Sequence, residues 1–183
     1  MSDYRDEEKE LAIYGLKRLG MFVASIIFTT IIGLVMGNIH GVFLFLMFFI
    51  PLRIFAGGLH LPALWMCAIA SSILIVVIAI ILNNIERIWI HGRICSAIFL
   101  IGALIIMLLA PVDTVNKKLF REEKIRFKLI SIVITMAEVA IFFICQNNKF
   151  IKVLIYMVIM VEAFYLTVQK IINCISAKRS QSE

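Results

Sequence analysis

Long apolar stretches alternate with short polar segments along most of this chain. A helix that crosses a bilayer needs about 20 mainly apolar residues, and that length marks six segments. They run approximately over residues 21–38, 41–56, 61–82, 94–111, 129–145 and 150–167. The pattern therefore predicts an all-α fold, a polytopic membrane protein with about six transmembrane helices.

The composition excludes most soluble classes of protein. Hydrophobic residues make up 62% of the chain and charged residues only 16%, against about 45–50% and about 25% in soluble domains. We predict a single integral membrane domain over residues 1–183, with a cytoplasmic segment at 1–20, a transmembrane region at 21–174 and a cytoplasmic tail at 175–183. The net charge of +6 then reflects loops beside anionic lipids, and we expect no nucleic-acid partner.

The distribution of basic residues predicts the orientation of the chain. With six crossings, both termini share one side with the loops near residues 53–62 and 112–128, and that side holds 14 of the 18 lysines and arginines. Lysine and arginine collect on the cytoplasmic side of a membrane. We therefore place both termini and these two loops in the cytoplasm.

Two of these cytoplasmic segments have an interfacial character. Acidic residues precede a periodic run near Leu11, Tyr14 and Arg18, which favours either an amphipathic helix on the membrane or a simple lead-in to the first span. Residues 113–128 interleave apolar and basic side chains. That loop is either a connector bound to headgroups or a docking surface for an acidic partner segment.

The second apolar segment is the least regular of the six. Pro51 and Arg53 lie in its C-terminal half. Proline interrupts a helix and a charge is costly in lipid. The segment either ends early or lines a wetted cavity buried in protein.

The residues after Arg53 bring a histidine and a cysteine close together in sequence. His60 and Cys67 are seven residues apart, which in one continuous helix separates them by about 10.5 Å along the axis. Gly57, Gly58 and Pro62 instead favour a loop that folds His60 back over the start of the next helix. Cys67 would then lie near the positive end of that helix, where a histidine and the dipole both favour the reactive thiolate.

Arg53, Gly57, Gly58, His60 and Cys67 together form the run R-x-x-x-G-G-x-H-x-x-x-x-x-x-C. This run resembles the signature of AgrB, the accessory gene regulator B family of bacterial quorum-sensing peptidases. Two other stretches are similar to the family. They are Tyr14-Gly15-Leu16 and the Ala110-Pro111-Val112 segment with Asn116-Lys117, although Lys118 stands where the family often has proline.

The resemblance implies a membrane cysteine endopeptidase that removes the C-terminal tail of an AgrD-like precursor peptide and cyclises the product as a thiolactone or lactone. On this chain it implies Cys67 as the nucleophile and His60 as the general acid and base. The supporting or substrate-binding positions are Arg53, Gly57, Gly58, Asn116 and Lys117. From the residues alone, Arg53 could bind a carboxylate or a peptide carbonyl, or extend to lipid headgroups.

Glu138 and Glu162 lie inside the fifth and sixth apolar segments. Such carboxylates are costly in a membrane and are often functional. They are either protonated or paired with a neighbouring helix, or they belong to a rival function, a small proton-coupled transporter or peptide exporter. A third hypothesis, a scaffold without catalysis, does not explain the segment from Arg53 to Cys67.

The remaining chemistry of the chain is sparse. Four cysteines occur without a CxxC pair or a zinc-finger spacing, so we predict no disulfide framework, no metal site and no cofactor. Six spans of this size bury little surface among themselves. A homodimer would provide partners for polar groups that face the lipid.

Overall fold

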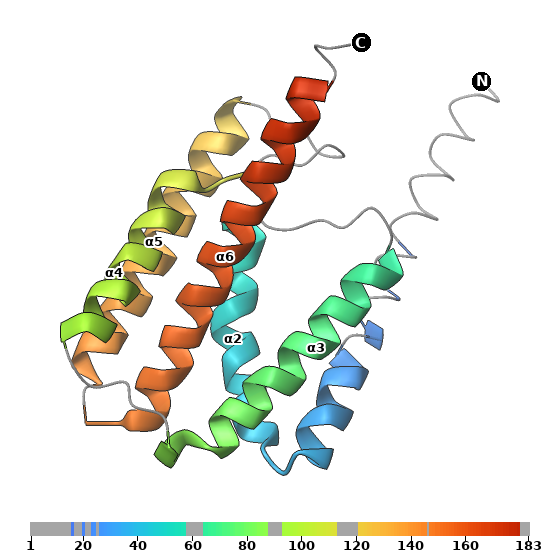
Figure 1. The fold of residues 1–183 in the computed structure, drawn as a ribbon, viewed down its shortest axis with the longest axis vertical. Coiled ribbons are helices and arrows are strands. Elements are labelled where there is room, and N and C mark those ends of the chain that lie inside the picture. The colour runs from blue at the N-terminus through green and yellow to red at the C-terminus, as the bar shows by residue number, and fades with distance from the viewer. Residues whose placement is uncertain are drawn as a thin grey trace.

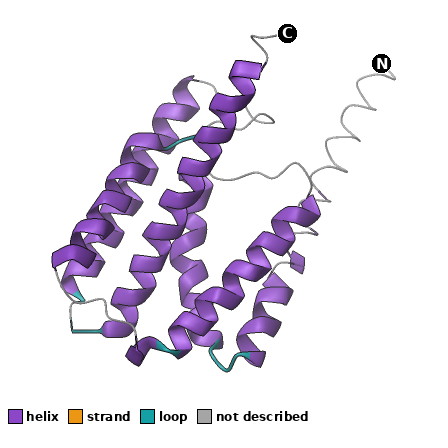
Figure 2. Cartoon of the chain, in the orientation of Figure 1, coloured by secondary structure: helices purple, strands orange, loops and turns teal. Residues whose placement is uncertain are grey.

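The structure, a computed structural model, describes residues 26–57, 64–87, 93–112, 121–145 and 147–179, with isolated helical positions at 16, 20, 23 and 24. The regular elements within these ranges are all helical (Figure 2). In chain order they are a first helix at Ile26–Val35, α2 at Ile39–Ala56, α3 at Leu64–Asn83, the 3₁₀ turn η1 at Ile85–Arg87, α4 at Arg93–Leu109, α5 at Arg121–Ile144 and α6 at Lys149–Arg179.

These helices confirm the predicted all-α fold with six helices. Three of them, α2, α5 and α6, are long and apolar enough to cross a membrane over Ile39–Ala56, Glu122–Ile144 and Lys149–Ser176. The apolar parts described for the other three are shorter. The number of six crossings therefore stays a prediction.

The helices run alternately up and down between the two ends of an elongated bundle (Figure 1). At one end α2, α4 and α6 finish while α3 and α5 begin, and we call this the site end. Helix α6 is the central element, because it packs against α2, α3, α4 and α5.

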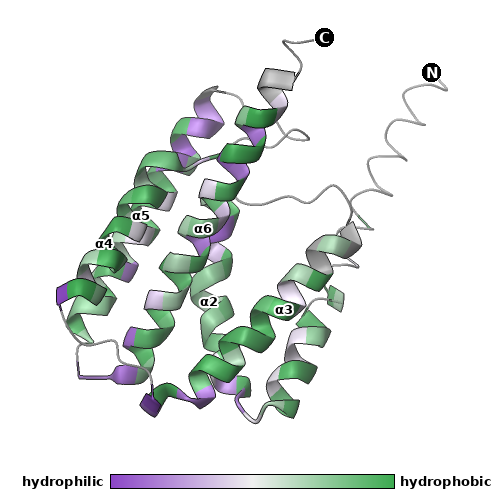
Figure 3. Cartoon of the chain, in the orientation of Figure 1, coloured by the Kyte–Doolittle hydropathy of each residue, from purple (hydrophilic) through white to green (hydrophobic). Residues whose placement is uncertain are grey.

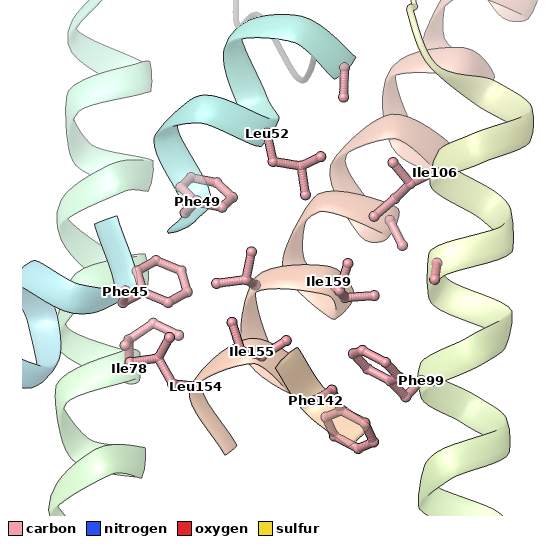
Figure 4. Close-up of a cluster of buried hydrophobic side chains, with 14 of the residues drawn as sticks. Phe45, Phe49, Leu52, Ile78, Phe99, Ile106, Phe142, Leu154, Ile155 and Ile159 are labelled. Atoms are coloured by element: carbon pink, nitrogen blue, oxygen red, sulfur yellow. The ribbon is translucent and has the colours of Figure 1, made fainter. Parts of the chain in front are cut away.

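Apolar side chains from five helices fill the interior around α6 (Figure 4). The cluster includes Phe45 of α2, Ile78 of α3, Phe99 of α4, Phe142 of α5 and Ile159 of α6. The Phe99 and Phe142 rings stack with centroids 3.9 Å apart. This core joins α4, α5 and α6 on one side of the bundle to α2 and α3 on the other.

Large apolar side chains also cover the outside of the bundle, for example Phe43, Ile73 and Val133. Hydrophobic residues extend along the helices, and hydrophilic residues gather mainly towards the bundle ends (Figure 3). This distribution is typical of a protein whose outer surface contacts lipid.

Hydrogen bonds tie the elements together at the end opposite the site end. Asn83 donates to the Met36 carbonyl at 2.7 Å and accepts from the Asn38 side chain at 2.9 Å. Lys149 at the start of α6 contacts Glu86 of η1, with 3.6 Å between Nζ and Oε2. The ends of the first helix, α3 and α6 therefore have polar anchors here.

Helix α2 decides between the alternatives left open for the second apolar segment. Helix α2 continues through Pro51 to Ala56, so the reading in which the segment ends early is wrong. Pro51 is exposed at this point, and the apolar packing of the buried neighbours Phe49 and Leu52 holds the helix together despite the missing hydrogen bond.

Helix α5 begins at Arg121, inside the predicted loop 112–128, and α6 continues to Arg179. Arginine, glutamate and lysine form helices readily in water, and Glu122 and Glu123 suit the positive end of α5. A criterion based on apolar length detects only the part of a helix that contacts lipid. The interfacial prediction for residues 1–20 lies outside the described part of the chain, apart from isolated positions.

Candidate functional site

Arg53 lies in the last turn of α2 and its side chain turns into the bundle. The guanidinium Nη1 lies 3.7 Å from Oε2 of Glu162 on α6. The Arg53 Cζ lies 4.5 Å from the centroid of the Tyr165 ring and 5.7 Å from that of Phe49. Of the alternatives for Arg53, a contact with the lipid headgroups alone is therefore not what the structure shows.

Glu162 is fully buried, and 28% of the Arg53 side chain is exposed. A buried carboxylate loses its hydration, and an ion pair with a guanidinium offsets part of that loss. The pairing of Glu162 with a neighbouring helix, one of the two expected arrangements, is what the structure shows. The partner is Arg53 of α2.

Glu138 of α5 is also buried, with 2% of its surface exposed. Its carboxyl oxygens have no hydrogen-bond partner among the residues that the structure describes. The carboxyl lies near enough to Glu162 for the two groups to interact electrostatically. Thr135 and Ser131, one and two turns earlier on α5, are buried too, so α5 presents a polar stripe to the interior.

Gly57 ends α2 and meets the segment that follows α4. Its φ angle is 82°, in the region that glycine alone adopts readily. A Cβ atom at this position would lie 2.9 Å from the Val112 carbonyl oxygen. The Val112 amide donates to the Ala56 carbonyl at 3.2 Å. Two motifs that are far apart in the sequence, around Gly57 and around Ala110-Pro111-Val112, therefore lie in contact.

Cys67 is the fourth residue of α3, in its first turn. The helix begins at the site end (Figure 1), so the cysteine backbone lies at the positive end of the helix dipole, where a thiolate is favoured. His60, Gly58, Asn116 and Lys117 lie outside the described residues, as does the Cys67 side chain. The contact between His60 and Cys67 stays a prediction.

An aromatic contact joins α2 to α5 at the site end. Phe55 of α2 and Phe127 of α5 meet edge to face, with ring centroids 5.7 Å apart. Because Phe127 lies in the part of α5 that the sequence assigned to a loop, this contact could not be foreseen. It gives the site end an apolar wall next to Arg53 and Gly57.

Three cysteines, Cys95, Cys145 and Cys174, are free thiols. Within the described ranges, no group of three or more histidine, cysteine, aspartate or glutamate side chains could hold a metal ion. Of the residues that the sequence assigns to the site, the structure describes Arg53, Gly57 and the backbone of Cys67, and it adds Glu162 to them.

Comparison with known proteins bears on what this arrangement does. Residues 1–166 match the model of the family described as Accessory gene regulator B. This stretch covers the whole segment from Arg53 to Cys67 and also Glu162.

The chain belongs to the AgrB family.

Two curated relatives agree with this assignment, both from Clostridium perfringens. The chain is 31% identical over 129 residues to a putative AgrB-like protein 2 of strain 13 and 32% identical over 129 residues to a putative AgrB-like protein of strain SM101. Each alignment covers 67% of this chain and 59% of the relative, so the chain spans about three fifths of their length. No solved structure matches.

Glu162 and Val112 are the residues whose place at the site the sequence did not reveal. For Glu162 a signal was available, because Arg53 and Glu162 are opposite charges that both lie inside apolar segments, and such charges usually pair. For Val112 there was no comparable signal, since its contact uses backbone atoms.

Proposed function

We propose that this member of the AgrB family is a cysteine endopeptidase of the cell membrane, with Cys67 as nucleophile and His60 as general acid and base. It cleaves the C-terminal tail from an AgrD-like precursor. The observation that carries the proposal is the family match over residues 1–166, which includes both residues. The position of Cys67 in the first turn of α3 supports it.

The reaction proceeds by two acyl transfers. The Cys67 thiolate attacks the scissile carbonyl, the peptide C–N bond breaks, and His60 gives a proton to the leaving amine. A thiol or hydroxyl within the precursor then attacks the thioester, His60 takes the proton from this group, and the Cys67 thiolate leaves as the ring closes. When the attacking group is a thiol, one thioester replaces another, so the second step is nearly isoenergetic.

Ring closure requires that water does not reach the thioester first. The apolar wall of Phe55 and Phe127 beside the end of α2 is suited to limiting the access of water. Substantial hydrolysis to a linear peptide by the purified protein in bilayers would count against the cyclising part of this proposal.

The test measures the reactivity of Cys67 directly. Cys95, Cys145 and Cys174 are replaced by serine, and the rate of alkylation by iodoacetamide is followed against pH in bilayers, with and without His60→Ala. We expect Cys67 to react with a midpoint well below the ordinary thiol pKa of about 8.5, and to lose that reactivity with His60. A thiol that is inert and indifferent to His60 would refute the dyad.

The partners of the enzyme follow from the same proposal. We place both termini and the dyad on the cytoplasmic side, where the basic segment between α4 and α5 with Asn116 and Lys117 contacts the precursor. Arg53, Gly57 and Gly58 support the dyad. A homodimer remains part of the proposal, and cross-linking of the protein in native membranes tests it.

A small proton-coupled transporter or peptide exporter is the second candidate. The observation that favours it is the buried Glu138 on the polar stripe of α5. Glu138→Gln separates the two functions. A peptidase retains cleavage of a co-expressed AgrD-like precursor in this variant, whereas a proton-coupled carrier loses transport.

A further inference from the structure

The ion pair between Arg53 and Glu162 lies where three helices meet. Helices α2, α5 and α6 all pack against one another. The guanidinium is held by the Glu162 carboxylate at 3.7 Å and by the rings of Tyr165 and Phe49. Tyr165 lies one turn beyond Glu162 on α6, and Phe49 lies one turn before Arg53 on α2. Helices α2 and α6 therefore each contribute a charge and an aromatic ring to the same contact.

This arrangement keeps Arg53 inside the bundle. Moving the arginine out to the membrane surface would leave a fully buried carboxylate without its counter-charge, and that state is strongly disfavoured. The Glu162 carboxylate and the Tyr165 ring both attract the guanidinium, so its position is restrained by two contacts on α6. The last turn of α2 therefore has little freedom to rotate or slide against α6.

The fixed turn leads directly into the predicted catalytic loop. The Gly57 amide donates to the Arg53 carbonyl at 3.2 Å, and the next contact along the chain is that of Ala56 and Gly57 with Val112. His60 follows Gly57 by three residues, which span at most about 10 Å. The position of the end of α2 therefore limits where His60 can lie, and catalysis is sensitive to displacements of about 1 Å.

We propose that Glu162 is a positioning residue of the peptidase, which holds Arg53 from α6 and thereby fixes the end of α2 so that His60 meets Cys67. The proposal rests on the function proposed above. Glu162 touches neither the substrate nor the reacting atoms. It acts through Arg53 and the backbone that follows it.

Glu162→Gln tests the proposal in the variant that keeps Cys67 as its one cysteine. The probe is iodoacetamide, and the readout is the alkylation rate of Cys67 against pH in bilayers. We expect the midpoint to move towards that of His60→Ala. Each unit by which the midpoint rises above pH 7 lowers the rate at pH 7 about tenfold, because only the thiolate reacts. A purely structural role would change the melting temperature but leave this profile in place.

Glu138→Gln is the matched control, since it makes the same substitution at another buried glutamate. Because the Glu138 carboxyl interacts electrostatically with Glu162, we expect a shift of the Cys67 profile that is clearly smaller than the shift in Glu162→Gln. Glu162→Asp is the second variant. It keeps the charge, so the protein is not left with an unpaired arginine, but it draws the carboxylate away from Arg53 and should give a smaller shift in the same direction.

The outcomes separate the two proposals. If the parent shows an activated Cys67 and both Glu162 variants keep its profile, the positioning role is overturned while the dyad stands. An equal shift in Glu138→Gln would also overturn the positioning role, because the loss of either buried carboxylate would then change the Cys67 profile. If the parent Cys67 is not activated, the dyad itself fails, and the positioning role fails with it.

Discussion

At the scale of single residues, Gly57 is the position where backbone conformation and packing impose the strictest requirement. Its φ is 82°, and a Cβ atom added there would lie only 2.9 Å from the Val112 carbonyl oxygen, so strain and crowding act together. We expect Gly57→Ala to reduce the free energy of unfolding by about 1–3 kcal/mol, the typical range for strained backbone. Thermal unfolding in detergent, followed by circular dichroism, measures the loss.

Gly37 provides a control that separates strain from crowding. Its φ is also positive, at 69°, but a Cβ there would meet nothing within 4 Å. We expect Gly37→Ala to lower the melting temperature less than Gly57→Ala does. Equal decreases in the melting temperature would mean that the Val112 segment moves aside without destabilising the protein. Its contact with Gly57 would then not hold the end of α2.

At the scale of helices, the packing of α4 on α6 depends on a small residue. Gly102 of α4 is buried, and a Cβ there would lie 3.1 Å from Cγ2 of Ile159 and 3.3 Å from Sδ of Met160. Small residues allow membrane helices to approach closely. We expect Gly102→Leu to force α4 away from α6 and to destabilise the protein by about 1–3 kcal/mol, as measured by thermal unfolding in detergent.

Ile101→Leu is the control for this helix. Ile101 precedes Gly102 but 57% of its surface is exposed on the outside of the bundle. The substitution conserves volume and should leave the melting temperature nearly unchanged. If Gly102→Leu also left the melting temperature unchanged, α4 and α6 would be able to move apart at no cost. Their continuous apolar contact makes such a separation unfavourable.

At the scale of the whole molecule, the sequence predicts the helices better than their mutual contacts. Apolar segments identify all six helices, because lipid requires length and hydrophobicity. Where charged residues stand in place of apolar ones, as at Glu122 and Glu123 at the start of α5, the criterion of apolar length misses helical turns. The contacts of Arg53 with Glu162 and of Gly57 with Val112 join residues far apart in the chain, and only tertiary packing brings them together.

The orientation of the bundle gives the last prediction. By the positive-inside rule, we expect the site end to lie in the cytoplasm. Two exposed positions report on the two ends: Glu122 near the start of α5 and Arg87 in η1. With the four native cysteines replaced by serine, Arg87→Cys should react with a membrane-impermeant maleimide in intact cells. Glu122→Cys should react only after the cells are opened.

The two cysteine variants also test the number of crossings. Helix α5 carries the chain from the site end to the far end, and α3 carries it in the same direction (Figure 1). If α3, α4, α5 and α6 all cross, the two labels must lie on opposite sides of the membrane. Labelling of both positions from outside would require that α4, the helix between them, does not cross. Labelling of Glu122→Cys alone would mean that the molecule is inverted. An inverted molecule would put Cys67 outside the cell, away from a precursor made in the cytoplasm, so this measurement bears on the proposed function as directly as it does on the topology.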